Sequence, residues 1–419
     1  MALVRAHPSS DQPDLRTNGR AHGVDLPSGW DCVRLGAHFD FKNGFNATKA
    51  AYGAGLRFAN ILEVITRSHL RAEDVPGRVS ISAALRDDFL VRRGDILFNR
   101  TSETQEEVAL ASVYVDDEEI IFGGFVIRAR AKDASFDPVF AGYAFRSAAV
   151  RSQMMALGQG AIHANIGQEA LATVTVARPP LPEQRAIVSA LTDIDGLIRA
   201  DEALIVKKQD IRSAAGHLLL TGSTRLPGST AEWKEVAFGA LAQPRKERIE
   251  PRRSGRQEFC IELEHLDQGT GRLLGSATLA ENASMKSVFL PGDVLFGKLR
   301  SYLRKYWLAD RPGVCSTEIW PLTANPKETT PPFLLQTVKT TGFVEAACQA
   351  YGTHMPRADW NVVRTYRLRV PGLPEQREIA AVLSDMDTEV DCLQARLAKT
   401  RDLKQAMVQE LLSGRTRLV

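Results

Sequence analysis

The sequence predicts an α+β protein in which two mixed domains alternate with two long helices. The first observation is an internal repeat: residues 181–226 return at 373–418, shifted by 192 residues without a gap and with 19 identities. The second is the heptad spacing of apolar residues in both copies, which is typical of a coiled coil. The third is that short apolar runs separated by Gly, Asp and Asn precede each copy, which favours strands. Two helical copies therefore separate two sheet-containing domains.

These observations divide the chain into five segments. Residues 1–25 are rich in Pro, Ser, Asp, Asn and Arg and lack the apolar run of a signal peptide, so we expect a disordered leader. Two domains of mixed strands and helices are expected at 26–180 and 223–372, and the repeat helices at 181–222 and 373–419. No stretch approaches the length of about 18 consecutive apolar residues that a membrane span requires, so we expect a cytoplasmic protein.

Short sequence patterns predict the strands and a helix of the first domain. Strands are expected at four apolar runs, 57–64, 95–98, 108–115 and 120–127. The pattern at 140–156 favours one helix. The second domain repeats two anchors of the first: PGDVLF at 291–296 matches RGDILF at 93–98, and LPG with a following Trp matches LPSGW. Outside such anchors the two domains have diverged.

Each repeat helix is expected to begin at the pentapeptide LPEQR. Proline in the first turn has a suitable φ, and a carboxylate there suits the helix dipole. This pentapeptide could seat a partner, seat the adjoining domain, or only start the helix. Its residues are Leu181, Pro182, Glu183, Gln184 and Arg185, and Leu373, Pro374, Glu375, Gln376 and Arg377.

The seam of the second helix is apolar throughout, whereas the first helix places Asp201, Lys208 and Arg212 on its seam, which weakens it. About 30 helical residues would give a rod of roughly 45 Å, ended by Gly222 and Gly414. The seam residues of the second helix are Ile379, Leu383, Met386, Val390, Leu393 and Leu397.

Sequence motifs for catalysis and metal binding are lacking. The five cysteines stand singly and the histidines show no metal spacing, so we expect free thiols and no metal site. GDVLFGKL at 292–299 resembles a phosphate-binding loop, but Leu299 replaces the required hydroxyl and the apolar VLF favours a strand. Asp193 and Asp195 lie two apart on a helix, which favours an exposed structural role over acid–base chemistry. We therefore expect no catalytic residue in this chain.

Basic residues gather in the second domain, where 20 basic and 15 acidic residues between 227 and 372 give a net charge of +5. Cations interleaved with aromatic side chains suit contacts with phosphates and base edges, although a solvated charged face would have the same composition. The candidate DNA-binding residues of this domain are Arg245, Lys246, Arg248, Lys298, Arg300, Tyr302, Arg304 and Lys305.

The first domain gives a weaker signal, because residues 27–180 hold 17 basic and 18 acidic residues. Asn and Arg at the end of the GDILF strand could contact adenine and guanine edges, or this segment could be a plain loop. The candidate DNA-binding residues are Lys42, Asn43, Lys49, Arg92, Arg93, Asn99, Arg100 and Thr101.

The arrangement of domain, LPEQ helix, domain and LPEQ helix resembles the DNA-specificity subunit of type I restriction-modification enzymes over residues 26–419. PPLPEQRAIVSALTDID, GLPEQREIAAVLSDMD, RGDILFNRT, PGDVLFGKLRSYLRK and the terminal GRTRL carry this resemblance. It implies two target-recognition domains on double-stranded DNA, an antiparallel coiled coil, and a pseudo-two-fold frame. It also implies two methyltransferase subunits as partners, with motor-nuclease subunits joining them for restriction. S-adenosylmethionine and ATP with magnesium would then be bound by those partners, and no cofactor by this chain.

Two other classes of function remain open at this point. A helical scaffold with duplicated protein-binding domains would share the repeat, but its binding would not weaken steeply with salt as DNA binding does. An enzyme with an unrecognised site is disfavoured by the missing methyl-donor, metal and phosphate motifs. If the two helices are antiparallel, a two-fold axis relates the two domains. Domains related in this way contact opposite DNA strands, at half-sites about one helical turn apart, roughly 34–36 Å. Divergent domains then predict an asymmetric target with an uncontacted spacer.

Overall fold

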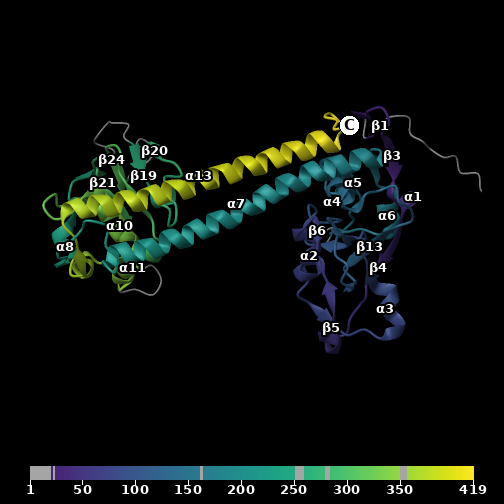
Figure 1. Cartoon of the computed structure of the whole chain (residues 1–419), viewed down its shortest axis with the longest axis horizontal. Helices are drawn as coiled ribbons and strands as arrows, with labels where there is room; N and C mark the ends of the chain where they lie inside the picture. Colours follow the sequence, from purple (N-terminus) through teal and green to yellow (C-terminus); the bar gives the residue numbers. More distant parts are fainter. Residues whose placement is uncertain (1–19, 22–23, 161–163, 251–258, 279–283, 350–355) are drawn as a thin grey trace, which may run out of the picture. The chain divides into compact units, whose positions relative to one another are not determined.

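The computed structural model describes residues 20–21, 24–160, 164–250, 259–278, 284–349 and 356–419. The chain divides into two units (Figure 1): unit 1 comprises Met1–Ala200 and Leu397–Val419, and unit 2 comprises Asp201–Arg396. Each unit therefore holds sheets and one end of each long helix. The domain boundaries expected from the sequence, which separate the helices from the domains, stay predictions.

Unit 1 is built around two mixed sheets, with strand orders β4-β13-β9-β11-β6 and β7-β5-β12-β8. Most neighbouring strands are antiparallel, but β6 lies parallel to β11 and β5 parallel to β12. Three two-stranded sheets, β1-β2, β3-β15 and β10-β14, complete the unit. The strands are β1 (Arg20–Ala21), β2 (Val24–Asp25), β3 (Asp31–Arg34), β4 (Phe39–Asn43), β5 (Tyr52–Ala59), β6 (His69–Leu70), β7 (Arg78–Val79), β8 (Leu90–Val91), β9 (Ile96–Asn99), β10 (Thr101–Ser102), β11 (Ala111–Tyr114), β12 (Ile120–Phe122), β13 (Val126–Ala131), β14 (Ala164–Asn165) and β15 (Thr175–Arg178).

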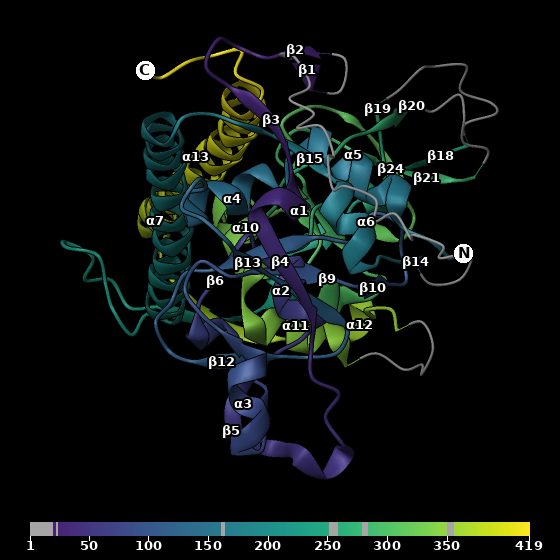
Figure 2. The same ribbon diagram turned by 90° about the vertical axis from the view of Figure 1, so that its right-hand side faces the viewer.

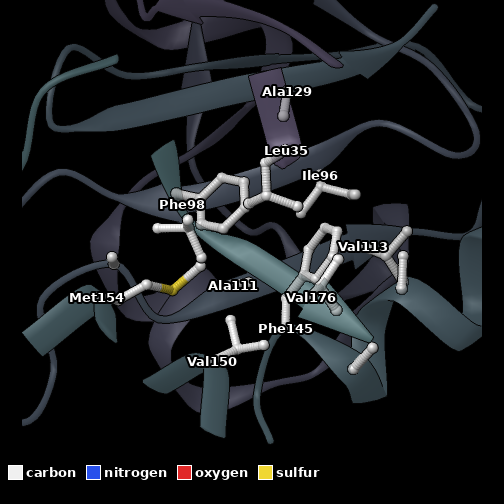
Figure 3. Close-up of a cluster of buried hydrophobic side chains, with 14 of the residues drawn as sticks. Leu35, Ile96, Phe98, Ala111, Val113, Ala129, Phe145, Val150, Met154 and Val176 are labelled. Atoms are coloured by element: carbon white, nitrogen blue, oxygen red, sulfur yellow. The ribbon is translucent and has the colours of Figure 1, made fainter. Parts of the chain in front are cut away.

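Short helices cover the first of these sheets and enclose the larger core of unit 1. Phe98 of β9 and Phe145 stack with ring centroids 6.0 Å apart, and Val150 and Met154 pack in the same buried cluster (Figure 3). Figure 2 shows α1 beside α6, and both helices contact β4. The helices are α1 (Leu35–His38), α2 (Ile61–Thr66), α3 (Ala83–Phe89), α4 (Pro138–Ala144), α5 (Ala148–Leu157) and α6 (Gln168–Thr173), with 3-10 turns η1 (Lys49–Ala51) and η2 (Ala72–Asp74).

Unit 2 also has two larger sheets, with orders β17-β25-β22-β23 and β18-β21-β24-β19-β20, and a β16-β26 pair. Its strands are β16 (Lys234–Ala237), β17 (Ala242–Pro244), β18 (Arg248–Ile249), β19 (Phe259–Ile261), β20 (Ala277–Thr278), β21 (Lys286–Phe289), β22 (Val294–Gly297), β23 (Tyr306–Leu308), β24 (Gly313–Ser316), β25 (Ile319–Ala324) and β26 (Arg367–Val370). Its short helices are α8 (Phe238–Leu241), α10 (Pro331–Lys339), α11 (Thr341–Cys348) and α12 (Trp360–Val363), with 3-10 turns η3 (Leu263–His265) and η5 (Ser301–Leu303).

The same sheet is built twice from diverged sequences. The order β4-β13-β9-β11 in unit 1 corresponds to β17-β25-β22-β23 in unit 2, with RGDILF leading into β9 and PGDVLF into β22. The buried aspartate of each motif pairs with an arginine from a different place in the sheet: Asp95 pairs with Arg130 of β13 at 2.6 Å, and Asp293 pairs with Arg245, directly after β17, at 2.8 Å. Each aspartate also accepts a hydrogen bond from the backbone N–H three residues earlier. The repeated anchors therefore mark a shared fold, and the predicted α+β class is confirmed.

The repeat helices are α7 (Leu181–Thr221, 41 residues) and α13 (Leu373–Leu412, 40 residues). They are longer than the roughly 30 residues expected, and at 1.5 Å per residue each extends about 60 Å. Both end as predicted, before glycines with φ of +73° at Gly222 and +72° at Gly414.

Within each unit the start of one long helix packs against the end of the other (Figure 1). In unit 1, Ile187 of α7 shares a buried cluster with Leu411 of α13. In unit 2, Leu219 of α7 shares one with Ile379 and Leu383 of α13. The helix pair is therefore antiparallel in both units, as the resemblance implied.

Several local predictions for the first domain were wrong in detail. The strand expected at 57–64 stops at Ala59, because the Glu63 carboxylate accepts a hydrogen bond from the Asn60 N–H at 2.9 Å and starts α2. The strand expected at 120–127 is interrupted after β12 by a turn in which the Val126 N–H bonds to Gly123 O. The helix expected at 140–156 is two helices, because Ser147 has extended backbone between them.

Other predictions were partly correct. The strand expected at 95–98 is β9, whereas the one at 108–115 is limited to β11, after Ala109 with its φ of +55°. Residues 1–19 and 22–23 of the expected leader lie outside the described residues. Arg20–Ala21 pairs with Val24–Asp25, so disorder was a wrong prediction for those four positions.

Candidate nucleic-acid interface

The LPEQ segment of α7 closes unit 1 around a buried carboxylate. Glu183 is 1% exposed and accepts a hydrogen bond from Trp30 Nε1 at 2.9 Å. Arg417, from the GRTRL segment after α13, donates from Nε and Nη2 to the same carboxylate, the second at 2.7 Å. A tryptophan near the domain start, a helix start and the chain end therefore meet at one site.

The corresponding segment of α13 closes unit 2 in the same way. Glu375 is 6% exposed and accepts from Trp233 Nε1 at 3.2 Å. Arg225, in the TRL that follows α7, donates to its two oxygens at 2.7 and 2.8 Å. The repeated Glu, Trp and Arg anchors of the sequence thus form one arrangement that occurs twice.

The glutamine of each LPEQ segment fixes the helix start to its own domain. Gln184 is fully buried; its Nε2 donates to Pro179 O at 2.8 Å and Ser135 O at 3.0 Å, and its Oε1 accepts from Asp137 N at 2.7 Å. Gln376 donates in the same way to Pro371 O and Glu328 O and accepts from Thr330 N, and it also accepts from Thr329 Oγ1. Of the three roles left open, this geometry shows that LPEQR seats the adjoining domain.

Other members of the predicted helix interface separate into buried and exposed groups. The apolar seam residues Ile379, Leu383, Leu393 and Leu397 are buried, and Met386 and Val390 are half-buried. Leu181 and Leu373 are half-buried at the helix starts. The exposed members, which leave side chains accessible in each unit, are Pro182, Arg185, Pro374 and Arg377.

The polar seam residues of α7 are ion-paired. Asp201, 2% exposed, pairs with Arg396 of α13, Lys208 with Glu389 at 2.7 Å, and Arg212 with Asp387 at 2.6 Å. Each polar residue of the α7 seam therefore meets an opposite charge on α13, and the expected weakening of the seam stays a prediction.

One of these pairs occurs in both repeat copies. Asp195 and Asp387 are equivalent in the repeat, as are Lys404 and Arg212. Lys404 Nζ lies 2.5 Å from Asp195 Oδ1, and Arg212 Nε lies 2.6 Å from Asp387 Oδ1. Asp195 also accepts from Tyr143 Oη at 2.7 Å. Asp195 therefore has a structural role, as predicted, but it is half-buried and paired rather than exposed as we expected.

The Asp387 carboxylate makes the free energy of unfolding of unit 2 depend on pH. Burial by itself would raise its pKa, but hydrogen bonds and charges from Arg212 and Lys339 outweigh burial and hold the pKa of Asp387 below its usual value. The unfolded carboxyl has an ordinary pKa of about 3.9. The stabilisation is therefore complete above that pH and is lost as the pH falls through the lower folded-state pKa.

We expect Asp387→Asn to remove this contribution. Denaturant unfolding of the full chain between about pH 6 and about pH 2 should show a flatter acid dependence in the variant, because the unfolded wild-type carboxyl binds a proton before the folded one does. Equal slopes for the two chains would contradict the assignment.

The predicted DNA-binding residues of unit 2 fall into two groups, those whose side chains bond to other described residues of the chain and those whose side chains do not. Arg245 is paired with Asp293, Lys305 Nζ donates to Leu263 O at 2.7 Å, and Arg304 donates to Thr341 Oγ1 at 3.3 Å. These three side chains hold the domain together. The structure shows no hydrogen bond or ion pair between another described residue and the side chains of Lys246, Arg248, Lys298, Arg300 or Tyr302.

In unit 1, four of the candidate DNA-binding side chains form ion pairs or hydrogen bonds of 3.1 Å or less with other residues of the chain. Lys42 pairs with Asp88 at 2.6 Å, Arg93 with Asp117 at 2.7 Å, and Thr101 Oγ1 donates to Asn165 Oδ1 at 2.6 Å. Asn99 is fully buried and donates to Glu107 O, so its prediction as a base contact was wrong.

The remaining candidates of unit 1 stay accessible. Arg100 is half-buried, with a 3.4 Å hydrogen bond to Gly124 O. Asn43, Lys49 and Arg92 are exposed, and within the described part of the chain no ion pair involves Lys49 or Arg92. Among the candidate residues, accessible cations are therefore fewer in unit 1 than in unit 2.

Unit 2 also contains a cleft of about 1060 Å³ lined by residues of α7, α10 and α13. Its cations are largely neutralised, since Arg212 and Lys339 pair with Asp387 and Arg272 pairs with Asp391. Over the described ranges no group of three metal-binding side chains occurs, and no helix there is long and apolar enough to cross a bilayer.

Two solved structures share the fold of this chain. The chain aligns over 93% of its length with 98% of a crystal structure of a type I restriction-modification S subunit from M. genitalium, with a TM-score of 0.57 and 16% identity. It aligns over 94% of its length with 99% of the HsdS subunit from Thermoanaerobacter tengcongensis, with a TM-score of 0.52 and 18% identity. The chain therefore has the fold of these specificity subunits.

Sequence comparison gives a family match for the first part of the chain. Residues 27–207 match the model of the type I restriction modification DNA specificity domain. A stretch of 157 residues is 28% identical to the specificity subunit of the type I restriction enzyme EcoDI from Escherichia coli. That match covers 36% of this chain and about a third, 35%, of the relative's length. Residues 27–207 are therefore similar to the type I DNA specificity domain that the sequence resemblance indicated, and the solved structures show the same fold over nearly the whole chain.

Proposed function

We propose that this chain recognises a bipartite, asymmetric sequence in double-stranded DNA, with each domain contacting one half-site. The observation that carries the proposal is that the domain matched by the DNA-specificity family is built a second time, on the same sheet, in unit 2. Unpaired cations and an exposed tyrosine at the end of β22 supply groups suited to phosphates and base edges. Sequence divergence between the domains supports two different half-sites.

The proposal includes a place in a larger assembly. Methyltransferase subunits, two for each chain, would bind this protein, and motor-nuclease restriction subunits could join them. Those partners would bind S-adenosylmethionine and ATP with magnesium and carry out the chemistry, so that this chain selects the site without catalysing a reaction. The exposed Pro182, Arg185, Pro374 and Arg377, beside the fixed helix starts, are accessible for such docking.

Salt dependence separates DNA binding from the scaffold alternative. The affinity of the chain for duplex DNA, measured by fluorescence anisotropy with its methyltransferase present, should fall steeply with salt as counterions are released. Replacing Lys298 or Arg300 with Ala should weaken binding by about 1–3 kcal/mol if the contact is to a base, or lower the salt slope by about 1 if it is to a phosphate.

Arg311→Ala is the matched control, because this exposed arginine of unit 2 is already paired with Asp310 at 2.7 Å. It should leave affinity nearly unchanged. A partner protein bound with salt-independent affinity, together with no duplex binding by the wild-type complex, would favour the scaffold instead.

A further inference from the structure

Two loops occupy the same place in the repeated sheet. The segment 100–107, called loop 1, follows β9 in unit 1, and the segment 298–305, called loop 2, follows β22 in unit 2. In loop 1 the Arg100 carbonyl accepts from Ile166 N at 3.0 Å; in loop 2 the Lys298 carbonyl accepts from Ala358 N at 2.8 Å. Ile166 and Ala358 are themselves separated by the repeat distance of 192 residues. The loops are therefore structural equivalents.

Loop 2 is fixed in one shape by its own backbone and by neighbouring segments. Arg300 N donates to Pro356 O at 2.9 Å, Arg304 N donates to Ser301 O at 3.0 Å, and Lys305 Nζ donates to Leu263 O at 2.7 Å. Such anchoring at both ends keeps the segment between them preorganised for a ligand.

Loop 2 also stores backbone strain. Arg300 has φ of +52° and Arg304 has φ of +50°; in the described part of the chain the only other non-glycine residue with positive φ is Ala109. Glycine would adopt this conformation without strain, so arginine at both positions indicates that the side chains are needed. For Arg304 that need is met by its hydrogen bond to Thr341. The Arg300 side chain is exposed and has no hydrogen-bond or ion-pair partner among the described residues, so its need is not explained within the domain.

The accessible groups of loop 2 fit guanine and phosphate. An arginine guanidinium can donate two parallel hydrogen bonds to O6 and N7 of guanine, which a lysine cannot reproduce with the same geometry. Tyr302, 53% exposed at the turn between the two strained arginines, adds an aromatic face and a hydroxyl. Lys298, half-buried at the start of the loop, adds a second cation near the same surface.

Loop 1 presents the opposite charge. Its sequence is RTSETQEE, and Glu103 and Glu106 are exposed, with no ion pair to either side chain among the described residues. Carboxylates repel phosphates, but they can accept hydrogen bonds from the exocyclic N4 amino group of cytosine. Loop 1 is held in place like loop 2, through β10 paired with β14 and through Thr101 bonded to Asn165.

We propose that loops 1 and 2 are the base-contacting elements of the two domains, and that their opposite charge makes them select different bases. Arg300 in loop 2 contacts guanine, and the carboxylates of loop 1 contact an amino-bearing base. This inference rests on the proposed function, which it deepens by assigning a base class to each half-site.

The test uses the full chain with its methyltransferase and a set of duplexes in which each position of the wild-type target is substituted in turn. Arg300→Lys keeps the positive charge and a side chain of similar length. It loses the guanidinium group that donates two parallel hydrogen bonds to one base. It should reduce discrimination at one guanine of one half-site by about 5- to 150-fold and leave all other positions unchanged. The Glu103→Ala, Glu106→Ala double variant should lose discrimination in the other half-site only.

Arg311→Lys, an equally conservative change at an exposed arginine of unit 2, is the control and should discriminate as the wild type does. Thermal unfolding of every variant checks that the fold is retained. If the wild-type complex prefers no duplex, the proposed function itself fails. If it discriminates but both loop variants discriminate identically to it, the function stands and the loop assignment is overturned.

Discussion

Gln184→Met is expected to destabilise unit 1 by about 3 kcal/mol or more. Methionine keeps the length and helix propensity of glutamine, but it leaves Pro179 O, Ser135 O and Asp137 N unpaired at a fully buried site. Each buried polar group without a partner costs about 1–3 kcal/mol. Denaturant unfolding followed by hydrogen exchange should show the loss of protection in unit 1.

Gln376→Met should have the matching effect in unit 2, because three of its four partners, Pro371 O, Glu328 O and Thr330 N, correspond to those of Gln184. Gln209→Met is the control, since Gln209 is exposed on α7; a change of less than about 0.5 kcal/mol is expected there. If the two LPEQ variants unfold like the control, the pentapeptide does not seat the domains.

Asp387→Ala is expected to destabilise unit 2 by about 3 kcal/mol or more. The variant leaves Arg212 and the 9% exposed Lys339 side chain without their counter-charge, and breaking a buried ion pair on one side has a cost of this size. Burial already lowers the pKa of Lys339 despite its ion pair with Asp387, which shows how poorly its charge is solvated.

Asp385→Ala is the control for this change, because Asp385 is exposed two residues earlier on the same helix. A triple variant with apolar residues at 212, 339 and 387 should recover most of the lost stability, since it leaves no unpaired charge. An Asp387→Ala chain as stable as the control would show that the ion-pair cluster contributes nothing to the fold.

Much of the architecture could be predicted because it depends on local patterns. Heptad spacing and the glycines Gly222 and Gly414 set the helix pair and its ends, and the strand at 95–98 follows from a short apolar run between polar turns. Predictions failed where a short-range polar contact overrides the apolar pattern. Glu63 capping Asn60 turned the expected strand into helix α2 in this way.

The anchoring site could not be assembled from the sequence, because its members are distant along the chain. Trp30 and Glu183 are 153 positions apart, and Glu183 and Arg417 are 234 apart. The repeat nevertheless contained the signal, since Trp, LPEQ and TRL recur together in both halves. Co-occurrence showed which residues belong together but not that they touch.

The charge pattern of the sequence likewise could not show which cations are paired within the folded chain. Composition marked Arg245 and Arg300 alike, yet the partner of Arg245 is an aspartate 48 residues away, while Arg300 has none among the described residues. Only the folded chain separates cations that hold the domain from cations left for a ligand.

Sequencing of modified bases in cells that contain this chain and its methyltransferase tests the central claim most directly. The account predicts methylation confined to an asymmetric, bipartite sequence, and replacement of residues 223–372 by the second domain of another family member should change one half-site and leave the other intact. Methylation without a bipartite sequence, or a replacement that alters both half-sites or neither, would contradict it.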